Sequence, residues 1–251
     1  MIDFYFWGVA VAAVFLVAIA KSGLLASIGV IGVPLLTLVM APRDAAGMML
    51  PVLLVMDAIA LTAYRREVDW RNLKVLVPGA ILGIALGWAL SSVVSDEIVL
   101  LGLGIITLLF VLDAWLPLRK KLEGLPPSVP WGVFWGGAAG FTSFVSHTGG
   151  PPYQIYVLPQ RLAPAIFAGT TAWTFAIINA VKLVPYFFLG QLSAANLKVS
   201  ATLVPVAVAG MFLGIYLVRR ISADLFYHLA YVLIFLLSLK LIYDGVSGLY
   251  F

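Results

Sequence analysis

Long apolar runs dominate this chain, and they restrict it to folds that a lipid bilayer can hold. A membrane-spanning helix needs about 20 predominantly apolar residues. Soluble domains are ~45–50% apolar and ~25% charged, whereas this 251-residue chain is 63% hydrophobic and 10% charged. The runs cover about 4–20, 22–41, 45–63, 75–92, 98–116, 131–147, 149–160, 164–189, 199–218 and 224–243. The sequence therefore predicts an all-α integral membrane protein surrounded by lipid.

Two of these runs, 131–147 and 149–160, are too short to span and are rich in glycine and proline. Non-helical backbone at membrane depth survives only where it is buried in protein or lines a cavity. The two runs thus predict a re-entrant hairpin or a pair of short broken helices. The first run, 4–20, follows Met1-Ile2-Asp3 without a basic residue. A secretory signal is normally basic there, so we expect this run to stay in the membrane.

Basic residues form three clusters between the apolar runs. The clusters consist of Arg65, Arg66, Arg71 and Lys74; of Arg119, Lys120 and Lys121; and of Arg219 and Arg220. Because cytoplasmic loops of membrane proteins are enriched in Lys and Arg, loops 64–74 and 117–130 are predicted to be cytoplasmic. Loops 93–97 and 190–198 then lie outside, and ten membrane-entering segments place both termini outside. The prediction is a multi-pass protein of the cell (inner) membrane.

The two halves of the chain share short motifs in the same order. The matched segments are 32–34 with 150–152 and Arg43 with Arg161 at an offset of 118, 72–74 with 196–198 at 124, and 78–87 with 205–214 at 127. Loop 64–74 is strongly basic whereas its counterpart 190–198 is not, so the halves are predicted to cross the membrane in opposite senses. Inverted repeats with interrupted helices are typical of secondary transporters, with the substrate near the midplane.

The predicted fold is therefore a polytopic helical bundle of two inverted repeats with 8–10 membrane segments. Each repeat combines a re-entrant or broken hairpin with three spanning helices. The first repeat covers 1–116, a cytoplasmic linker covers 117–130, and the second repeat covers 131–251.

The stretch 140–190 contains a specific series of motifs. In chain order these are Gly140-Phe141-Thr142-Ser143, His147-Thr148-Gly149-Gly150-Pro151-Pro152, Leu158-Pro159-Gln160, Gly169-Thr170-Thr171-Ala172 and Asn179-x2-Lys182. This series resembles the sulfite exporter TauE/SafE family of bacterial membrane permeases, and the resemblance covers essentially the whole chain. It implies a transporter of sulfite, organosulfonates or related small anions. The first-half element Gly29-x2-Gly32-Val33-Pro34 has Ala26, Ser27 and Ile28 where the family is usually richer in glycine, so the resemblance does not select one substrate.

Lys182 lies well inside run 164–189, with Asn179 three residues earlier on the same helical face. A charge at that depth costs several kcal/mol unless it is paired or hydrated (~2.5–3.5 kcal/mol on insertion scales). A cation beside an amide suits an oxyanion; the alternative is a lysine that extends to the outer interface.

His147 is expected at the turn of the second hairpin, with Ser143, Thr148, Gly149 and Gly150 around it. Glycine N–H groups and a helix start after Pro151-Pro152 would favour an anion there. His147 could also carry a proton. The alternative is a packed, hydrogen-bonded histidine at a helix break.

Further candidates come from other segments. Ser27, Gly29 and Gly32 occupy the matching place in the first hairpin, although small residues there also permit close helix packing. Thr170 and Thr171 could offer hydroxyls, or bond their own backbone four residues earlier. Asp57 could pair with a basic residue, carry a proton, or lie near the cytoplasmic helix end.

Several function classes find no support in the sequence. With no cysteine and two histidines, a metal or haem site would be poorly supplied, and no cofactor is predicted. No nucleotide-binding or hydrolase motif occurs, so no enzyme is predicted and transport would draw on a gradient. The net charge of +4 reflects topology, not nucleic-acid binding. The expected partners are a small anion and membrane lipid; a homo-oligomer is left open.

The sequence thus predicts a secondary permease for small oxyanions, most favourably sulfite or an organosulfonate, working by alternating access. Two half-helix hairpins, 22–34 and 143–152, would meet near the midplane. The alternatives are a passive anion channel, an intramembrane enzyme on lipid-linked substrates using Ser143 or Ser146 with His147, and a non-transporting scaffold.

Overall fold

A computed structural model describes residues 4–23, 32–36, 38–91, 95–115 and 127–250. All the regular structure in these ranges is helical, which confirms the predicted all-α class. The predicted candidates Ser27 and Gly29 lie outside the described residues.

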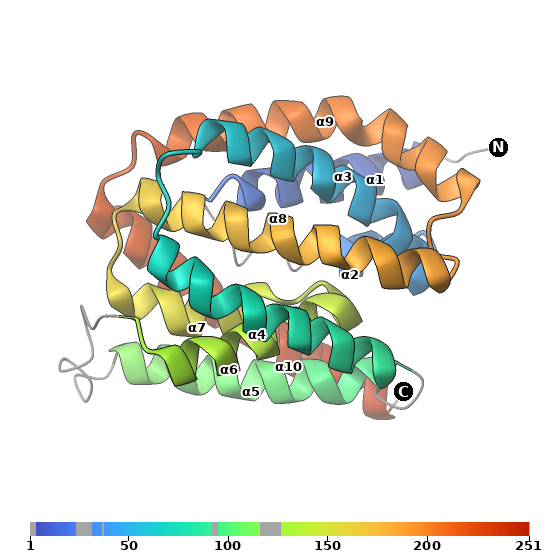
Figure 1. The fold of residues 1–251 in the computed structure, drawn as a ribbon. Coiled ribbons are helices and arrows are strands. Elements are labelled where there is room, and N and C mark those ends of the chain that lie inside the picture. Colours follow the sequence, from blue (N-terminus) through green and yellow to red (C-terminus); the bar gives the residue numbers. More distant parts are fainter. Residues whose placement is uncertain (1–3, 24–31, 37, 92–94, 116–126, 251) are drawn as a thin grey trace. The chain divides into compact units, whose positions relative to one another are not determined.

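The chain divides into two compact units, each built from two separate stretches of sequence (Figure 1). Unit 1 contains Met1–Asp69 and Pro164–Ile221, and unit 2 contains Trp70–Ala163 and Ser222–Phe251. The helices of unit 1 are α1 (Phe4–Lys21), α2 (Gly32–Leu36), α3 (Pro42–Ala63), α8 (Pro164–Phe188) and α9 (Ala194–Val218). Those of unit 2 are α4 (Trp70–Ala89), α5 (Asp96–Trp115), α6 (Val129–Ser146), α7 (Gly150–Val157), the 3₁₀ turn η3 (Leu158–Gln160) and α10 (Ala223–Tyr250).

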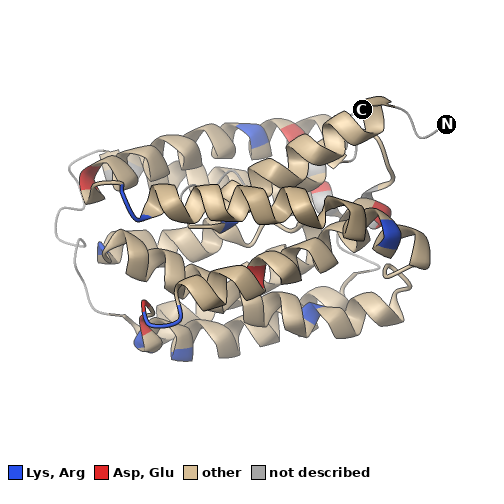
Figure 2. Cartoon of the chain, turned by 90° about the horizontal axis from the view of Figure 1, so that it is seen from above, with Lys and Arg blue, Asp and Glu red and all other residues tan. Residues whose placement is uncertain are grey.

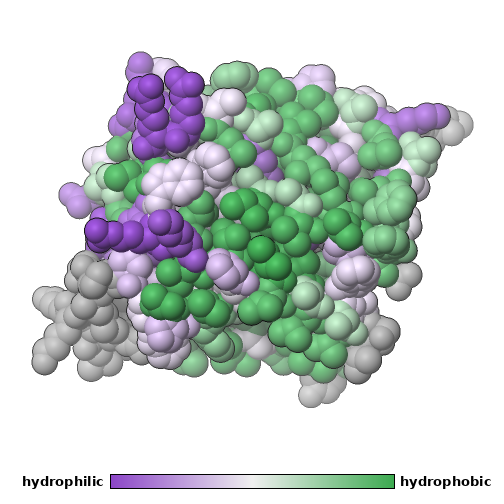
Figure 3. All heavy atoms as spheres, viewed as in Figure 1, coloured by the Kyte–Doolittle hydropathy of each residue, from purple (hydrophilic) through white to green (hydrophobic). Residues whose placement is uncertain are grey.

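Six of the described helices are long and apolar enough to cross a membrane: α1, α3, α4, α8, α9 and α10. Few charged residues interrupt the helices (Figure 2), and apolar side chains cover much of the face shown in Figure 3. Large exposed hydrophobics such as Phe134, Phe187 and Phe212, each at least 58% exposed, would be costly in water. The protein is therefore a multi-pass membrane protein.

Most apolar runs correspond to helices of the predicted length, but run 22–41 does not. Its described part contains only the five-residue α2 and a turn at residues 38–40. Gly23 ends the preceding segment with φ of +97°, a backbone conformation that interrupts a helix and favours glycine. The described residues of this run therefore form no helix long enough to span, although the length of the run suffices. The predicted second hairpin is present as α6, a turn at 147–149 and the eight-residue α7.

In unit 1, α3 packs against α1, α8 and α9. At one end, Arg219 after α9 donates to the Ala63 carbonyl oxygen at 2.8 Å and lies 3.5 Å from the Glu67 carboxylate. At the other end, Asn196 at the start of α9 donates to Asp44 at 3.1 Å. Loop 64–69 and Arg219 therefore share one end of unit 1, as the predicted topology requires, and segment 190–196 lies at the other.

The turn after α1 is fixed by two close contacts within unit 1. Tyr64 is buried and its hydroxyl donates to the Ser22 carbonyl oxygen at 2.8 Å. Burial raises the pKa of Tyr64, an effect that the nearby Arg219 opposes, so the hydroxyl stays a donor. A Cβ on Gly23 would lie 2.2 Å from the Ala168 Cβ. The end of α1 is therefore held against α8.

In unit 2, α4 and α6 approach each other through glycines. A Cβ on Gly83 would lie 2.0 Å from the Gly137 carbonyl oxygen, and one on Gly140 would lie 2.1 Å from the Ala80 carbonyl oxygen. Small residues at such positions let two membrane helices pack backbone to backbone. The glycines of α4 that the proposed repeat matches with α9 thus have a packing role in α4.

Each compact unit contains helices from both halves of the sequence, so the units are a different division from the predicted repeats. In unit 2, Asn72 and Gln160 exchange side-chain hydrogen bonds of 2.7 and 3.0 Å. In unit 1, Asn196 bonds Asp44. The proposed repeat matches Asn72 with Asn196 and Arg43 with Arg161. Asn72 contacts Gln160, the neighbour of Arg161, and Asn196 contacts Asp44, the neighbour of Arg43. The inverted repeat and its boundaries stay a prediction. Two matched asparagines that each contact the other half of the sequence are consistent with such a repeat.

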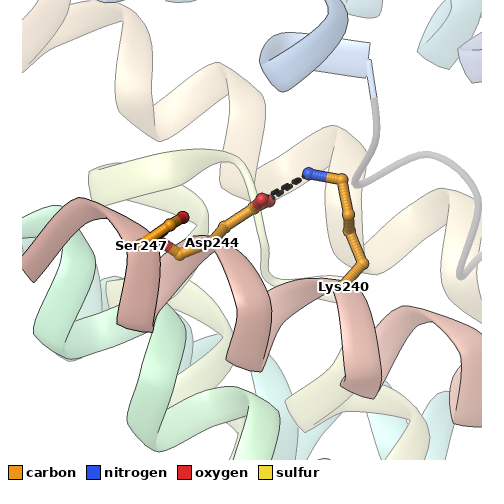
Figure 4. A network of polar contacts seen from close by, with 3 residues as sticks. All are labelled: Lys240, Asp244 and Ser247. Carbon is orange, nitrogen blue, oxygen red and sulfur yellow. Dashed lines mark hydrogen bonds and ion pairs between the residues drawn. The ribbon is translucent and has the colours of Figure 1, made fainter. Parts of the chain in front are cut away.

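An ion pair also lies on α10, which packs against α5. Lys240 Nζ contacts both carboxylate oxygens of Asp244 at 2.5 Å, one helical turn along (Figure 4). Both side chains are partly exposed, at 45% and 22%. This pair joins one cation to one carboxylate within a single helix.

Candidate functional site

Helix α8 places Asn179 and Lys182 deep inside unit 1. Three residues apart, they share one helical face, and they are 3% and 0% exposed. At 1.5 Å per residue, Lys182 lies about 27 Å from the start of α8 and about 9 Å from its end, and its side chain is fully buried. Lys182 therefore does not extend to the surface, in contrast to the interfacial alternative considered from the sequence.

Asp57 of α3 brings three helices together. Its Oδ2 accepts a hydrogen bond from Asn179 Nδ2 at 2.8 Å. Its Oδ1 lies 2.7 Å from the Nζ of Lys21, the last residue of α1, in an ion pair without hydrogen-bond alignment. The Lys21 and Asp57 side chains are 11% and 4% exposed. Of the roles considered for Asp57, the structure shows pairing with a basic residue.

We name Lys21, Asp57, Asn179 and Lys182 the buried charge cluster. Lys182 belongs with them because it is buried about one helical turn from Asn179 on the same face of α8. Aromatic rings line the lysines, with Lys182 Nζ 5.4 Å from the Tyr186 ring centroid and Lys21 Nζ 5.9 Å from that of Phe175. Two lysines and one aspartate give the cluster a formal charge of +1, from two positive charges and one negative charge.

Lys21 is not among the site residues predicted from the sequence, although the structure makes it a member of this cluster. The available signal was the cost of burying a lone carboxylate, which requires a cationic partner for Asp57. The sequence does not say which cation fills that role, because the contact depends on the turn that holds the end of α1 against α8.

Thr170 and Thr171 occupy the first part of α8, away from this cluster. Their hydroxyls donate to the carbonyl oxygens of Ile166 and Phe167, both at 2.7 Å. Thr170 also accepts from the Asp69 N–H at 2.9 Å. Both hydroxyls therefore bond the backbone four residues earlier, and Thr170 in addition holds the loop before α4. Along α8 they lie about 13 Å from Asn179.

Gly32, the described member of the first-hairpin candidates, begins α2 and is buried. A Cβ there would lie 2.1 Å from Val17 Cγ2. Its observed role is close packing of α2 against α1.

The turn between α6 and α7 in unit 2 carries the other candidates. His147 caps α6 with φ of +56°, a left-handed conformation that costs a non-glycine residue free energy. The N–H groups of His147 and Thr148 donate to the carbonyl oxygens of Ser143 and Thr142, both at 3.2 Å. The N–H groups of His147 and Thr148 therefore close the end of α6.

Hydroxyl groups complete this turn. The hydroxyl oxygens of Ser146 and Thr148 lie 2.7 Å apart, and Thr142 donates to the carbonyl oxygens of Ala138 and Thr148 at 2.8 and 3.2 Å. Ser143 and Thr148 are buried. Since Pro151 and Pro152 have no N–H, the backbone donors at the start of α7 are those of Gly149 and Gly150.

Apart from Gly32, Thr170 and Thr171, the predicted site residues that the structure describes form two groups. Asp57, Asn179 and Lys182 come together in unit 1, where Lys21 joins them, and Ser143, His147, Thr148, Gly149 and Gly150 come together in unit 2. Within the described ranges, no group of three or more acidic, histidine or cysteine side chains could hold a metal ion.

The family model described as sulfite exporter TauE/SafE matches residues 10–241 of the chain. The chain belongs to this family. Both groups of candidate residues lie inside the matched range, and the match confirms the resemblance carried by the motifs of 140–190. No curated protein and no solved structure gives a significant match.

Membership of the TauE/SafE family establishes the general function. The family implies a membrane exporter of sulfite or a related anion, and the six apolar helices fit that role. The buried charge cluster lies among three helices of this membrane protein, α1, α3 and α8.

Proposed function

We propose that this TauE/SafE protein is a secondary permease for a small oxyanion, most favourably sulfite or an organosulfonate. The observation that carries the proposal is the buried charge cluster, in which Asp57 and Lys182 lie more than a full helical turn from the ends of α3 and α8 and Asp57 pairs with Lys21 at the end of α1. Cations at such depth are costly and mark substrate or ion pathways. An oxyanion between the lysines would receive charge-assisted hydrogen bonds.

Access to this cluster requires movement. Its four side chains are between 0% and 11% exposed, so the described arrangement is closed to solvent. Alternating access, in which inverted repeats move around a central site, would open the cluster to each side in turn. His147 or Asp57 would carry a proton with the anion where transport is proton-coupled.

Transport itself is tested with the purified protein in lipid vesicles. Uptake of labelled sulfite or methanesulfonate should exceed that of protein-free vesicles and should saturate. Unlabelled anion on the opposite side should accelerate uptake, because an alternating-access carrier returns faster when loaded. Saturable uptake without this acceleration would favour the passive channel, and no uptake of either anion would contradict the proposed function.

We also propose that the protein lies in the inner membrane with loop 64–74 in the cytoplasm and 190–198 outside. Since the chain has no cysteine, single replacements can be labelled cleanly. Arg66 and Ala195 are both exposed and belong to segments at opposite ends of unit 1. An impermeant maleimide added to whole cells should label Ala195→Cys and leave Arg66→Cys unlabelled until the cells are permeabilised. The reverse pattern would invert the topology.

A further inference from the structure

The ion pair between Lys21 and Asp57 differs from the Lys240–Asp244 pair in its burial and in the elements that it joins. Lys21 ends α1 and Asp57 belongs to α3, and their side chains are 11% and 4% exposed. Lys240 and Asp244 lie four residues apart on α10 and are 45% and 22% exposed (Figure 4). The pair in unit 1 therefore links two helices and is largely shielded from solvent.

Both carboxylate oxygens of Asp57 are engaged. Oδ1 lies 2.7 Å from Lys21 Nζ without the alignment of a hydrogen bond, and Oδ2 accepts from Asn179 at 2.8 Å. The elements packed against α3 carry further titratable or charged groups, of which the first two are buried and the others exposed: Lys182 and Tyr186 of α8, Tyr5 of α1, Lys198 and Tyr216 of α9, and Arg219 just after α9. Asp57 thus has Lys21 in direct ionic contact and Asn179 in a hydrogen bond.

An oxyanion that bound to Lys21 would lie close to the Asp57 carboxylate. A charge-assisted N–H···O hydrogen bond is ~2.7–2.9 Å long, and Asp57 Oδ1 already lies 2.7 Å from the same Nζ. The anion oxygen and Oδ1 would therefore be at most about 5.6 Å apart. Two negative charges within ~4–6 Å repel each other, and protonation of one relieves the repulsion. The anion and the charged carboxylate thus compete for one lysine.

The chemistry of the two groups decides where that proton goes. A sulfonate is the anion of a strong acid, so the carboxylate takes the proton. The new O–H bond forms at Oδ1 of Asp57, because Oδ2 accepts from Asn179, and the proton comes from the aqueous side. The ion pair with Lys21 then breaks, and the lysine keeps its charge and donates to the anion.

We infer that Asp57 is the proton carrier of this permease and that proton and anion load together, because the proton on Asp57 releases Lys21 to the anion. One proton accompanies each anion, so a singly charged anion crosses the membrane without net charge. The inference rests on the proposed function, and it selects Asp57 over His147, the other candidate carrier.

Binding of methanesulfonate gives the first test, because this anion keeps one negative charge from about pH 5 to about pH 9, whereas sulfite takes up protons itself. Its dissociation constant is measured by calorimetry on the detergent-purified protein across this range. Wild-type binding should weaken as the pH rises, by up to ~10-fold per pH unit where one proton is taken up with each anion. Asp57→Asn keeps the shape without the charge, so its constant should not change with pH and should be at least ~10-fold lower than that of wild type at the highest pH.

Transport in lipid vesicles gives the second test. With an acidic exterior, wild-type protein should accumulate methanesulfonate and carry one proton inward with each anion, which a pH-sensitive dye records. A membrane potential set with potassium and valinomycin should leave the accumulation unchanged, because the two charges cancel. Asp57→Asn should still exchange methanesulfonate but lose the accumulation driven by the pH gradient. The matched control Asp244→Asn removes the carboxylate of the α10 pair and should keep that accumulation.

His147→Gln tests the other candidate carrier and keeps the experiment decisive where Asp57→Asn fails to fold. This variant should keep the pH dependence of binding and the proton that accompanies each anion, whatever its affinity. Wild-type uptake that ignores the pH gradient, loss of proton coupling in His147→Gln, or retained coupling in Asp57→Asn would overturn the inference and leave the proposed function standing. Wild-type protein that moves neither methanesulfonate nor sulfite would overturn the proposed function and the inference with it.

Discussion

Lys182→Met should weaken binding of methanesulfonate or sulfite by about 10- to 100-fold. The substitution keeps an unbranched side chain in the fully buried position and removes one of the two cations. A charge-assisted hydrogen bond contributes ~1.5–3 kcal/mol and a neutral one ~1 kcal/mol, and each 1.4 kcal/mol is a factor of ten. The remaining Lys21 and Asp57 would still form their ion pair, so a bound anion would lose one of its two cationic partners.

Two graded variants separate charge from shape at this position. Lys182→Arg should retain part of the affinity, because the charge remains while a larger planar group must fit. Asn179→Ala should fall between Lys182→Met and wild type, because its amide bonds the Asp57 carboxylate and so acts on the anion through that group. Binding is measured by calorimetry in detergent, with the size-exclusion profile as the folding check.

The matched control is Lys240→Met, which removes a membrane-helix lysine whose carboxylate partner lies four residues along α10. Its affinity for anions should equal that of wild type. A dissociation constant that stays the same in Lys182→Met would show that this lysine does not contact the anion and would leave the turn between α6 and α7 as the remaining candidate.

The sequence alone predicted the membrane class, the position of most helices and the broken second hairpin. These features depend on local patterns: apolar length defines a spanning helix, and Gly149-Gly150-Pro151-Pro152 interrupts one. The family resemblance also came from local motifs between residues 140 and 190, and the match over 10–241 confirms it.

What the sequence could not give is the set of partners that each element finds across long separations. Lys21 and Asp57 are 36 residues apart and Asp57 and Asn179 are 122 apart, so no periodic pattern connects them. Asn179 was expected to face the anion directly, but one of its N–H groups donates to Asp57. Run 22–41 is long enough to span. The backbone conformation at Gly23, which lies two residues after the end of α1, is a feature of the structure that the apolar length of the run does not predict.

The turn at His147 shows the same limit for backbone groups. Its residue types suggested a row of N–H donors for an anion, whereas the observed turn uses those of His147 and Thr148 to close α6. A sequence identifies that glycines and hydroxyls gather at a helix break. It does not decide whether the break satisfies its own carbonyl groups or leaves its donors for a ligand.

Gly150→Leu should abolish transport while the protein still inserts in the membrane. Gly150 is the first residue of α7, where an N–H group has no preceding helical carbonyl to bond. The two prolines that follow supply no donors, so an anion at this turn would depend on Gly149 and Gly150. A leucine side chain would block its approach to that backbone, which only a glycine leaves open.

The control for this prediction is Gly102→Leu in α5, where a Cβ would meet no atom within 4 Å. Both variants add the same side chain to a glycine of a membrane helix, so a general effect of leucine on insertion or expression would appear in both. Uptake of labelled sulfite into vesicles, with equal amounts of monodisperse protein, should be lost for Gly150→Leu and retained for Gly102→Leu. Normal uptake by Gly150→Leu would show that the α6–α7 turn is not on the anion path.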